Sequence, residues 1–550
     1  MKIPILFSKK FDLTILFSLI CIYLFLSSKE IMLPGVNFDE TFAATGTLSL
    51  LRNKNTDYVY LTDWTLWGRR FPLMTSAYDP ALSVYLLLPF FFVFGINVFS
   101  LRIAPISFGL LTLVFTYIFV KKFFNQKAAL IAMLLLVTNP YFIFAAKAGN
   151  YFLSYALFFS ITALVSFLKW YESGRIHYFI LGSFLLGLGL STLIHFGVLI
   201  IALVFLFLIF RKNINDKIQQ TRIKSLWIYL FLAGIFFCLG IFLFLYANLF
   251  NASTRFITLK CIFERFPKTG DGVTNLNYLN NLSIRFKNLL DFLGERDPIN
   301  RPIIFKKSNI FYLFVFFFAF LWLVFSLLFK KNMYFGKKTI LFILSFIGIT
   351  FIVSPFTLSS FKAYHFIILI PYIQLMTVIG LIEFSQHFRK KLIQIISRWL
   401  VFLIVLILIG FNLKIIQESY VDLKKLGGPS IWSDAIYELA DWLKEVRPSK
   451  IIALTWGLSR NLYFLLEGET YVYDIHSSPD FKFNEESFKN MLNHFFQDEQ
   501  SQYIANIQWN DQRAFELFKK AVNIAGKKLI EEKTFYHRDG KPLYIIYSVR

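Results

Sequence analysis

Long apolar stretches alternate with short polar turns along most of the chain. Stretches such as Phe11–Ser27, Leu226–Leu249, Phe311–Phe329 and Trp399–Leu413 approach or reach the roughly twenty residues that a helix needs to cross a hydrocarbon core. The pattern predicts an α-helical polytopic membrane protein with about eleven transmembrane helices. We place these helices at residues 11–28, 100–120, 128–146, 151–168, 178–194, 195–210, 226–248, 309–329, 339–356, 364–382 and 399–414.

Lysine and arginine are distributed unevenly over the turns between these helices. If the N-terminus, with Lys2, Lys9 and Lys10, lies in the cytoplasm, the other turns on that side hold most of the basic residues. They are Lys121, Lys122, Lys127, Lys169, Arg175, Arg211, Lys212, Lys217, Arg222, Lys224, Lys330, Lys331, Lys337, Lys338, Arg389, Lys390, Lys391 and Arg398. The opposite short loops hold little beyond Lys147 and Lys362. Because positive residues collect on the cytoplasmic side, we predict a cytoplasmic N-terminus and an external C-terminal tail, in the cytoplasmic membrane.

One further segment, Ala81–Asn97, is apolar enough to span, but the charge pattern argues against a span there. A crossing at this point would move every later basic cluster to the outside. Pro80 and Pro89 fit a broken helix that stays at the outer face. We therefore predict a juxtamembrane or re-entrant helix inside a large first external loop, residues 29–99, with a second external loop at residues 249–308.

Composition supports the membrane class and excludes others. The chain is 56% hydrophobic and 17% charged, whereas a soluble domain is about 25% charged. The net charge of +23 is explained by the cytoplasmic turns, so no nucleic-acid partner is expected. The three cysteines, Cys21, Cys238 and Cys261, have no CxxC spacing and imply no disulfide framework or metal cluster.

The composition becomes ordinary after Gly427-Gly428-Pro429. Helices are predicted at Ser433–Val446 and Gln512–Ala525, and strands at Lys450–Trp456, Glu469–Ile475, Gln502–Trp509, Lys528–Phe535 and Pro542–Ser548. The chain thus divides into a transmembrane domain, residues 1–414, and a small external α/β domain, residues 415–550. The tail shows no phosphate-binding glycine fingerprint and no metal spacing. The role of the tail remains open between acceptor recognition, support of a lid and a plain structural cap.

Asp39 and Glu40 are the first candidates for chemistry, because they lie just past the first span, at the start of the external loop. Acidic residues at a membrane interface are costly to desolvate and are functional hypotheses by default. An acid at this place could deprotonate an acceptor hydroxyl or amine as a general base. The alternative is a pair of solvated loop residues that caps a helix at Thr41–Leu51.

External cations form a second set of candidates, as partners for a phosphate group. Arg69 and Arg70 lie in the first external loop, and Arg102 begins the second span near the outer headgroups. Lys147 is almost the only charge in the turn between the third and fourth spans, and Lys362 lies at the outer start of the tenth. The alternative for each is interfacial anchoring or snorkelling.

Three further residues complete the candidate site. Tyr78 and Asp79 enter the broken helix in Tyr78-Asp79-Pro80, where Asp79 could bind a sugar hydroxyl, help a metal or simply form a turn. His365, beside Lys362, could bind phosphate or shuttle a proton, or could be only an interfacial residue. We expect His195, between the fifth and sixth spans, to be structural.

The order of these features resembles the N-terminal half of GT-C glycosyltransferases, in particular the protein O-mannosyltransferase and aminoarabinose transferase group (glycosyltransferase family 39-like). The residues that carry the resemblance are Asn37-Phe38-Asp39-Glu40, Pro72-Leu73-Met74, Tyr78-Asp79-Pro80, Tyr85, Pro89, Phe94-Gly95, Leu101-Arg102, Asn139-Pro140, Lys147 and Gly182 to Gly189. The resemblance covers residues 10–210 and extends weakly through Lys362–Pro371. It implies a membrane enzyme that uses a polyprenyl-phosphate sugar at the outer face, with Asp39 as the base and Glu40 in support.

Two departures from the family pattern limit what the resemblance implies. Relatives often have His-Pro-Pro where this chain has Tyr78-Asp79-Pro80, and many carry a second Asp where it has Gly149-Asn150-Tyr151. The second departure weakens the case for metal dependence. A divalent metal is possible but not supported, and we expect no required cofactor. We expect an inverting glycosyltransferase whose partners are membrane lipid, a polyprenyl-phosphate-linked hexose or pentose, and a protein, lipid or glycan acceptor. The rival is a polytopic transporter or a flippase for lipid-linked sugars, which the scarcity of mid-span charge and the absence of a visible repeat disfavour.

Overall fold

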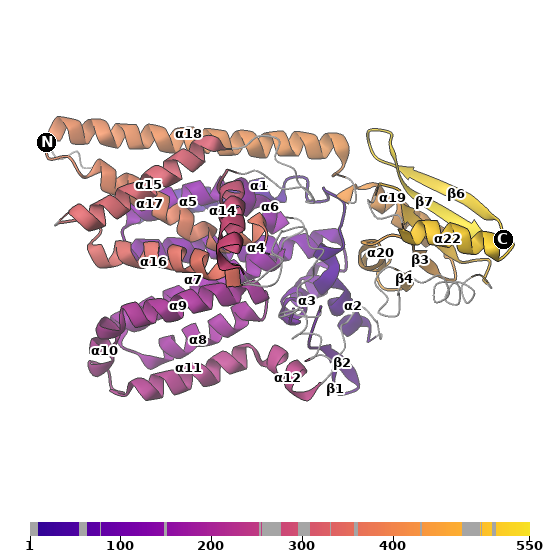
Figure 1. Ribbon diagram of the computed structural model, residues 1–550, viewed down its shortest axis with the longest axis horizontal. Coiled ribbons are helices and arrows are strands. Elements are labelled where there is room, and N and C mark those ends of the chain that lie inside the picture. Colours follow the sequence, from indigo (N-terminus) through magenta and orange to yellow (C-terminus); the bar gives the residue numbers. More distant parts are fainter. Residues whose placement is uncertain are drawn as a thin grey trace.

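The computed structural model describes most of the chain, and Figure 1 shows its arrangement. The described residues are 9–53, 63–76, 79–147, 151–251, 255, 277–294, 309–330, 332–356, 361–429, 432–475, 496, 498–508 and 513–550. The long helices pack side by side in one bundle, and the C-terminal domain lies beyond one end of it (Figure 1). Helices α2 and α3 lie between the two parts, so the first external loop is the junction of the molecule.

The bundle is built from helices that are rich in apolar residues. They are α1 (Lys9–Ser28), α4 (Val98–Phe123), α5 (Gln126–Val137), α6 (Pro140–Lys147), α7 (Tyr151–Ser173), α8 (Ile176–Leu190), α9 (Gly197–Ile209), α11 (Leu226–Gly240), α12 (Phe242–Phe250), α15 (Ile310–Phe329), α16 (Lys337–Val353), α17 (Ile370–Ser385) and α18 (Lys391–Leu426). Shorter elements connect them: η2 (Ile194–Phe196), α10 (Arg211–Gln219), α14 (Tyr278–Leu293), η3 (Ser354–Phe356) and η4 (Ala363–Leu369). A helix that is hydrophobic all round suits lipid or a buried core.

Six of the described helices are long and apolar enough to cross a membrane, and nine spans result if each of three bent helix pairs counts as one. The prediction of a polytopic helical membrane protein is therefore confirmed. The expected spans at 128–146 and 226–248 are both broken, by bends of 59° between α5 and α6 and 77° between α11 and α12. The shorter apolar helices include Thr14–Ser28 of α1 and the whole of α8.

The segment that we expected not to span forms α3 (Leu82–Phe94), with Pro89 inside it. Its 13 residues cover about 20 Å at 1.5 Å per residue, which is less than the roughly 30 Å of a hydrocarbon core. The helix therefore has the length of a juxtamembrane element. Which face of the membrane it lies on remains a prediction from the charges.

Helix α18 differs from the expected division of the chain at residue 414. It runs for 36 residues to Leu426, about 54 Å, and so extends well past the predicted span. It stops at Gly427, which adopts φ +74° as the helix C-cap. Only 22% of its apolar part is buried in the protein, against 94% for the span Ala363–Ser385, which joins η4 and α17. Figure 1 shows α18 along one edge of the bundle.

Glycines allow two helix pairs to pack with their backbones close together. A Cβ on Gly187 of α8 would lie 2.4 Å from the carbonyl oxygen of Phe237, and one on Gly240 of α11 would lie 2.5 Å from that of Phe184. Gly380 of α17 approaches Ala319 of α15 in the same way. Small residues at such contacts favour helix association in lipid, where the hydrophobic effect contributes little.

The first external loop consists of η1 (Asp39–Thr41), α2 (Phe42–Arg52), a hairpin of β1 (Asp63–Leu66) and β2 (Arg69–Pro72), and α3. It shares one continuous core with the C-terminal domain, whose buried side chains include Val36, Val84, Leu439 and Phe464. The domain is therefore packed onto the loop rather than tethered beside it.

The C-terminal domain is a five-stranded mixed sheet with helices on both faces. Its elements are α19 (Ala435–Val446), β3 (Ile451–Ala453), α20 (Ser459–Leu465), β4 (Val472–Asp474), β5 (Gln502–Asn506), α22 (Arg513–Ile524), β6 (Leu529–Tyr536) and β7 (Pro542–Val549). The strand order is β4-β3-β5-β7-β6, parallel among the first three and antiparallel afterwards. The predicted strands and helices are confirmed, but α20 was not predicted.

Candidate functional site

The adjacent acids Asp39 and Glu40 point into different environments. Glu40 is 2% exposed and forms a bidentate pair with Arg102 of α4, with Nε–Oε1 2.7 Å and Nη2–Oε2 3.0 Å. Asp39 is accessible to solvent. Asn37 fixes the turn that contains both acids, because its side-chain oxygen accepts a hydrogen bond from the Glu40 backbone N–H at 3.1 Å.

Arg102 links the first external loop to the transmembrane bundle. Besides Glu40, its guanidinium donates to the carbonyl oxygens of Ile31 at 2.6 Å and Pro34 at 2.8 Å, and the side chain is fully buried. Asn97 caps α4 five residues earlier and so fixes the turn that carries Arg102. This network gives Arg102 a structural position, and its role as a donor-phosphate contact stays a prediction.

The Asp39 carboxylate lies in a recess. Its side chain is accessible, yet the surrounding protein removes enough water to raise its pKa to about 6. The positive charges of Arg460 and Lys362 oppose that shift. The recess therefore places an acid with a near-neutral pKa between two cations, one from the C-terminal domain and one from the start of η4.

Asp79 belongs to the same recess. Burial raises its pKa to about 6, the hydroxyl of Ser76 lowers it by donating to Oδ2 at 2.8 Å, and the charge of Asp39 raises it further. The backbone around it forms a closed turn, since the Thr75 N–H donates to the Asp79 carbonyl oxygen at 2.9 Å. Among the described residues, its buried Oδ1 has no hydrogen-bond partner. The turn-forming alternative therefore describes the contacts of Asp79, and its role as a ligand stays a prediction.

Lys362 and His365 lie at the start of η4. Lys362 is half-buried, and its backbone N–H donates to Nδ1 of His365 at 2.9 Å. The ring of His365 stacks on His195, with 4.3 Å between centroids, so His195 helps to hold the other histidine. Arg285 of α14 donates to the carbonyl oxygen of Phe361 at 2.7 Å and fixes the backbone just before Lys362.

Lys147 is 1% exposed and anchors the end of α6. Its ammonium donates to the carbonyl oxygen of Lys29 and lies 4.6 Å from the centre of the Tyr420 ring on α18. The interfacial-anchor alternative describes this geometry, because the residue ties α6 to the ends of α1 and α18.

Arg69 and Arg70 lie on β2 with exposed side chains. The hairpin packs against α12 through Trp64, whose ring lies 6.0 Å from that of Tyr246. The cations that act electrostatically on Asp39 come from elsewhere. Tyr78, the remaining predicted site residue, lies outside the described residues.

Arg460 is a site residue that sequence reasoning missed. It lies in the first turn of α20, is 8% exposed, and donates from Nη1 to the Thr75 carbonyl oxygen at 3.4 Å. Its guanidinium lies 4.1 Å from the centre of the Phe42 ring. The available signal was a lone arginine between the apolar residues Leu458 and Leu462.

Within the described residues, no group of three or more His, Cys, Asp or Glu side chains could hold a metal ion. The charged groups of the recess are the carboxylates of Asp39 and Asp79 and the cations of Lys362 and Arg460. Metal dependence stays a question for experiment.

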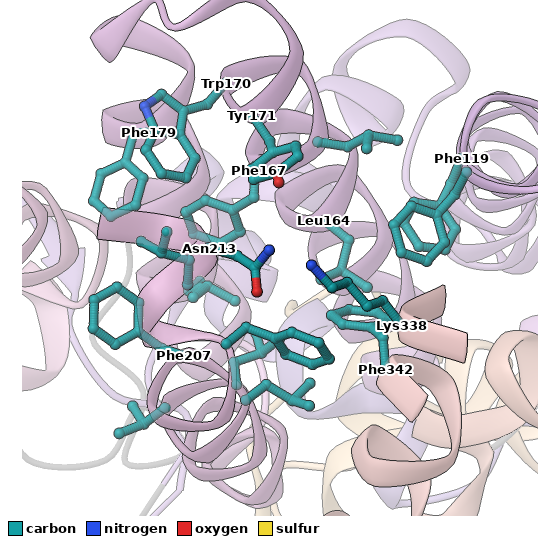
Figure 2. A pocket seen from close by; sticks show the side chains of 18 of the residues that line it. Phe119, Leu164, Phe167, Trp170, Tyr171, Phe179, Phe207, Asn213, Lys338 and Phe342 are labelled. Atoms are coloured by element: carbon teal, nitrogen blue, oxygen red, sulfur yellow. The ribbon is translucent and has the colours of Figure 1, made fainter. Parts of the chain in front are cut away.

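An apolar cavity of about 510 Å³ lies elsewhere, between α4, α7, α8, α9, α10, α11 and α16. Figure 2 shows Asn213 and Lys338 pointing into it among aromatic and aliphatic side chains such as Phe119 and Phe207. Phe123, which also lines it, follows Arg102 by 21 residues on α4 (123 − 102), about 31 Å along the helix axis. The cavity therefore lies at the far end of the bundle from Asp39.

Comparisons with known proteins agree with this architecture. Residues 79–243 match the sequence profile of the family described as dolichyl-phosphate-mannose-protein mannosyltransferase. No curated protein sequence matches the chain. The structure of ArnT from Cupriavidus metallidurans bound to undecaprenyl phosphate is similar with a TM-score of 0.58 and 12% identity, over 98% of both chains. An oligosaccharyltransferase from Archaeoglobus fulgidus gives a TM-score of 0.54 and 14% identity, over 93% of this chain and 71% of that one.

At these identities the solved structures establish the fold, and the family profile covers residues 79–243. The predicted resemblance, the GT-C-like architecture and the C-terminal α/β domain are confirmed. The chain is a multi-pass membrane protein with the GT-C fold, and its residues 79–243 match the sequence profile of the dolichyl-phosphate-mannose-protein mannosyltransferase family.

Proposed function

We propose that the protein transfers a sugar from a polyprenyl-phosphate donor to an acceptor hydroxyl or amine at the outer face of the cytoplasmic membrane, with Asp39 as general base. The observation that carries this proposal is the separation of the acidic pair: Asp39 is accessible in a recess beside Lys362 and Arg460, while Glu40 is buried against Arg102. A polyprenyl-phosphate donor is supported by the undecaprenyl phosphate bound to ArnT, which shares the fold.

The proposed step is a single displacement with inversion at the anomeric carbon. The acceptor oxygen or nitrogen forms a bond to that carbon as the bond from the carbon to the lipid phosphate oxygen breaks. Asp39 takes the acceptor proton, and the polyprenyl phosphate leaves with the electron pair as an anion. Cations placed where this negative charge develops stabilise the transition state, and Lys362 is half-buried at the recess.

Arg69 and Arg70 remain secondary candidates for the phosphate. Their hairpin is exposed and packs on α12, so they suit an outer contact with the donor headgroup better than a contact at the reacting bond. Asp79, with its carboxylate in the same recess, is a candidate for binding a sugar hydroxyl.

The pKa of Asp39 sets the expected pH dependence. A general base works when it is ionised, and it is most effective with a pKa near the working pH. With a pKa of about 6, Asp39 is a carboxylate at neutral pH and becomes protonated below pH 6. We therefore expect kcat/KM to fall on the acidic side with a midpoint near pH 6.

The test is release of polyprenyl phosphate in proteoliposomes from a panel of radiolabelled polyprenyl-phosphate sugars. This readout works for any acceptor, water included. Asp39→Asn should lose activity by about 100-fold or more, the usual contribution of a general base. The matched control is Asp441→Asn, an exposed aspartate on α19, which should keep full activity. Full turnover by Asp39→Asn would remove Asp39 from this role.

A further inference from the structure

We propose that Arg460 of the C-terminal domain is a positioning residue for Asp39, so that the catalytic site is complete only when this domain is docked. The proposal rests on the proposed function of Asp39 as the base. It gives the C-terminal domain a part in the chemistry, in place of acceptor recognition or a plain structural cap.

The sheet topology brings Arg460 to the recess. Strand β3 leads through Trp456 and Gly457 into α20, which is followed by the parallel strand β4. Residues that follow the carboxyl end of such a strand are the usual site-forming residues of open α/β sheets. Here they face the first external loop: the Trp456 ring lies 4.9 Å from that of Phe38, next to Asp39.

Arg460 contacts the two segments that carry the acids of the recess. On one side, its guanidinium lies over the rings of Phe42 at 4.1 Å and Phe38 at 5.5 Å, the residues that bracket η1. On the other side, it donates to the carbonyl oxygen of Thr75, which begins the turn that ends at Asp79. One buried side chain thus bridges the two acidic segments.

The placement of Arg460 is set by a specific domain interface. Asn461 beside it donates from its side chain to the carbonyl oxygen of Val36 at 3.2 Å. Phe464 of the same helix stacks on Phe91 of α3 at 5.9 Å, and Tyr437 of α19 donates to the carbonyl oxygen of Met32 at 2.7 Å. Because these contacts surround α20, a change at Arg460 alone leaves the docking of the domain largely in place.

The charge of Arg460 favours the ionised form of Asp39. The charged groups that act on Asp39 and its immediate surroundings are Arg460 from α20, Lys362 before η4 and Asp79 from the turn before α3. On α2, which also packs on η1, the charged residue is Arg52 at the far end, and it pairs with Glu467. Among the residues that the structure describes, removing Arg460 therefore leaves Lys362 as the cation that acts on Asp39 and Asp79 in the recess.

The experiment measures the protonation midpoint of Asp39 in the full-length protein. A carbodiimide reacts with a protonated carboxyl group, so its labelling of Asp39, quantified by mass spectrometry against pH, reports the midpoint without turnover. Arg460→Gln and Arg460→Met, which keeps an apolar stem against Phe42, should raise the midpoint by about one pH unit, as loss of a neighbouring opposite charge does. Arg460→Lys should stay near wild type. The control Arg447→Gln, exposed at the end of α19, should not move it.

Each outcome decides one of the two proposals. If the charge-free variants fold, as judged by gel filtration and thermal unfolding, and the midpoint stays unchanged, Arg460 only supports the domain and the inference is wrong. An equal shift in Arg447→Gln would also overturn it. If the midpoint shifts and the acidic limb of kcat/KM shifts with it, both proposals stand. If the midpoint shifts while wild type turns over no polyprenyl-phosphate sugar, the positioning role holds and the proposed function fails.

Discussion

The buried pair of Glu40 and Arg102 allows a quantitative prediction. Arg102→Leu would remove a guanidinium that is fully buried and would leave Glu40, 2% exposed, as an unpaired carboxylate. Breaking a buried ion pair from one side costs about 3–5 kcal/mol. The same change removes the Arg102 donor from the carbonyl oxygen of Ile31 and leaves that of Pro34 with the longer 3.5 Å hydrogen bond from the Tyr437 hydroxyl. An unsatisfied buried acceptor costs about 1–3 kcal/mol. Relaxation keeps these contributions from adding fully, so we expect a loss of at least about 4 kcal/mol.

A double-mutant cycle separates the coupling energy between Glu40 and Arg102 from the other contributions of these residues to stability. Glu40→Leu alone leaves the guanidinium buried without its carboxylate and should cost about 3–5 kcal/mol. In the double variant neither charge remains, so its loss should be smaller than the sum of the two single losses by about 3 kcal/mol. The assay is equilibrium unfolding in mixed micelles, followed by tryptophan fluorescence.

The matched control is the exposed pair of Arg52 and Glu467, at 3.3 Å with side chains 29% and 46% exposed. Its coupling energy should stay below about 1 kcal/mol, as for other solvated ion pairs. Additive losses at Glu40 and Arg102, or a coupling no larger than that of the control pair, would refute the reasoning. The ion pair of Glu40 and Arg102 would then be present in the structure without contributing to stability.

Two further predictions concern parts away from the recess. Replacing Arg69 and Arg70 by Ala should change the KM for the donor by less than about threefold, because both are exposed and solvated charges contribute little; a tenfold rise would instead place the donor phosphate at the hairpin. Gly240→Ala should lower the midpoint of thermal unfolding, because its Cβ would lie 2.5 Å from the carbonyl oxygen of Phe184 and overpacking costs about 1–3 kcal/mol. Gly234→Ala on the same helix, with nothing within 4 Å of its Cβ, should not lower it.

Most of the fold could be predicted because it follows from the composition of the chain and from the spacing of its apolar residues. The apolar stretches and the uneven lysines suffice for the bundle, and the same charges indicated that the segment of α3 does not span. The elements of the C-terminal domain follow from alternation and amphipathic spacing. Helix α20 escaped prediction because it has only seven residues, too few to establish a helical period in an apolar stretch. The end of α18 at Leu426 escaped because its polar last turns look like a tail.

The candidate site could be predicted only in part. Asp39 could be proposed from the sequence because its position after the first span is a local feature of the chain. The partner of Glu40 lies 62 residues away, and Arg460 lies 385 residues from the carbonyl oxygen that it contacts. Such pairings depend on how the elements dock, so the sequence did not indicate that Arg102 and Lys147 are buried in the structure.

The contrast between Asp39 and Glu40 comes from local geometry and from three distant residues. Both lie in a 3₁₀ turn, η1, in which successive side chains point about 120° apart, so two neighbouring acids cannot face the same surroundings. The side chain of Glu40 points inward to Arg102 of the transmembrane bundle, and this ion pair fixes the turn. The side chain of Asp39 points the other way, where the charges of Lys362 and of Arg460 from the C-terminal domain act on it. Changes at Arg102 should therefore act first on stability, and changes at Arg460 on the protonation of Asp39, although the two arginines act on adjacent residues.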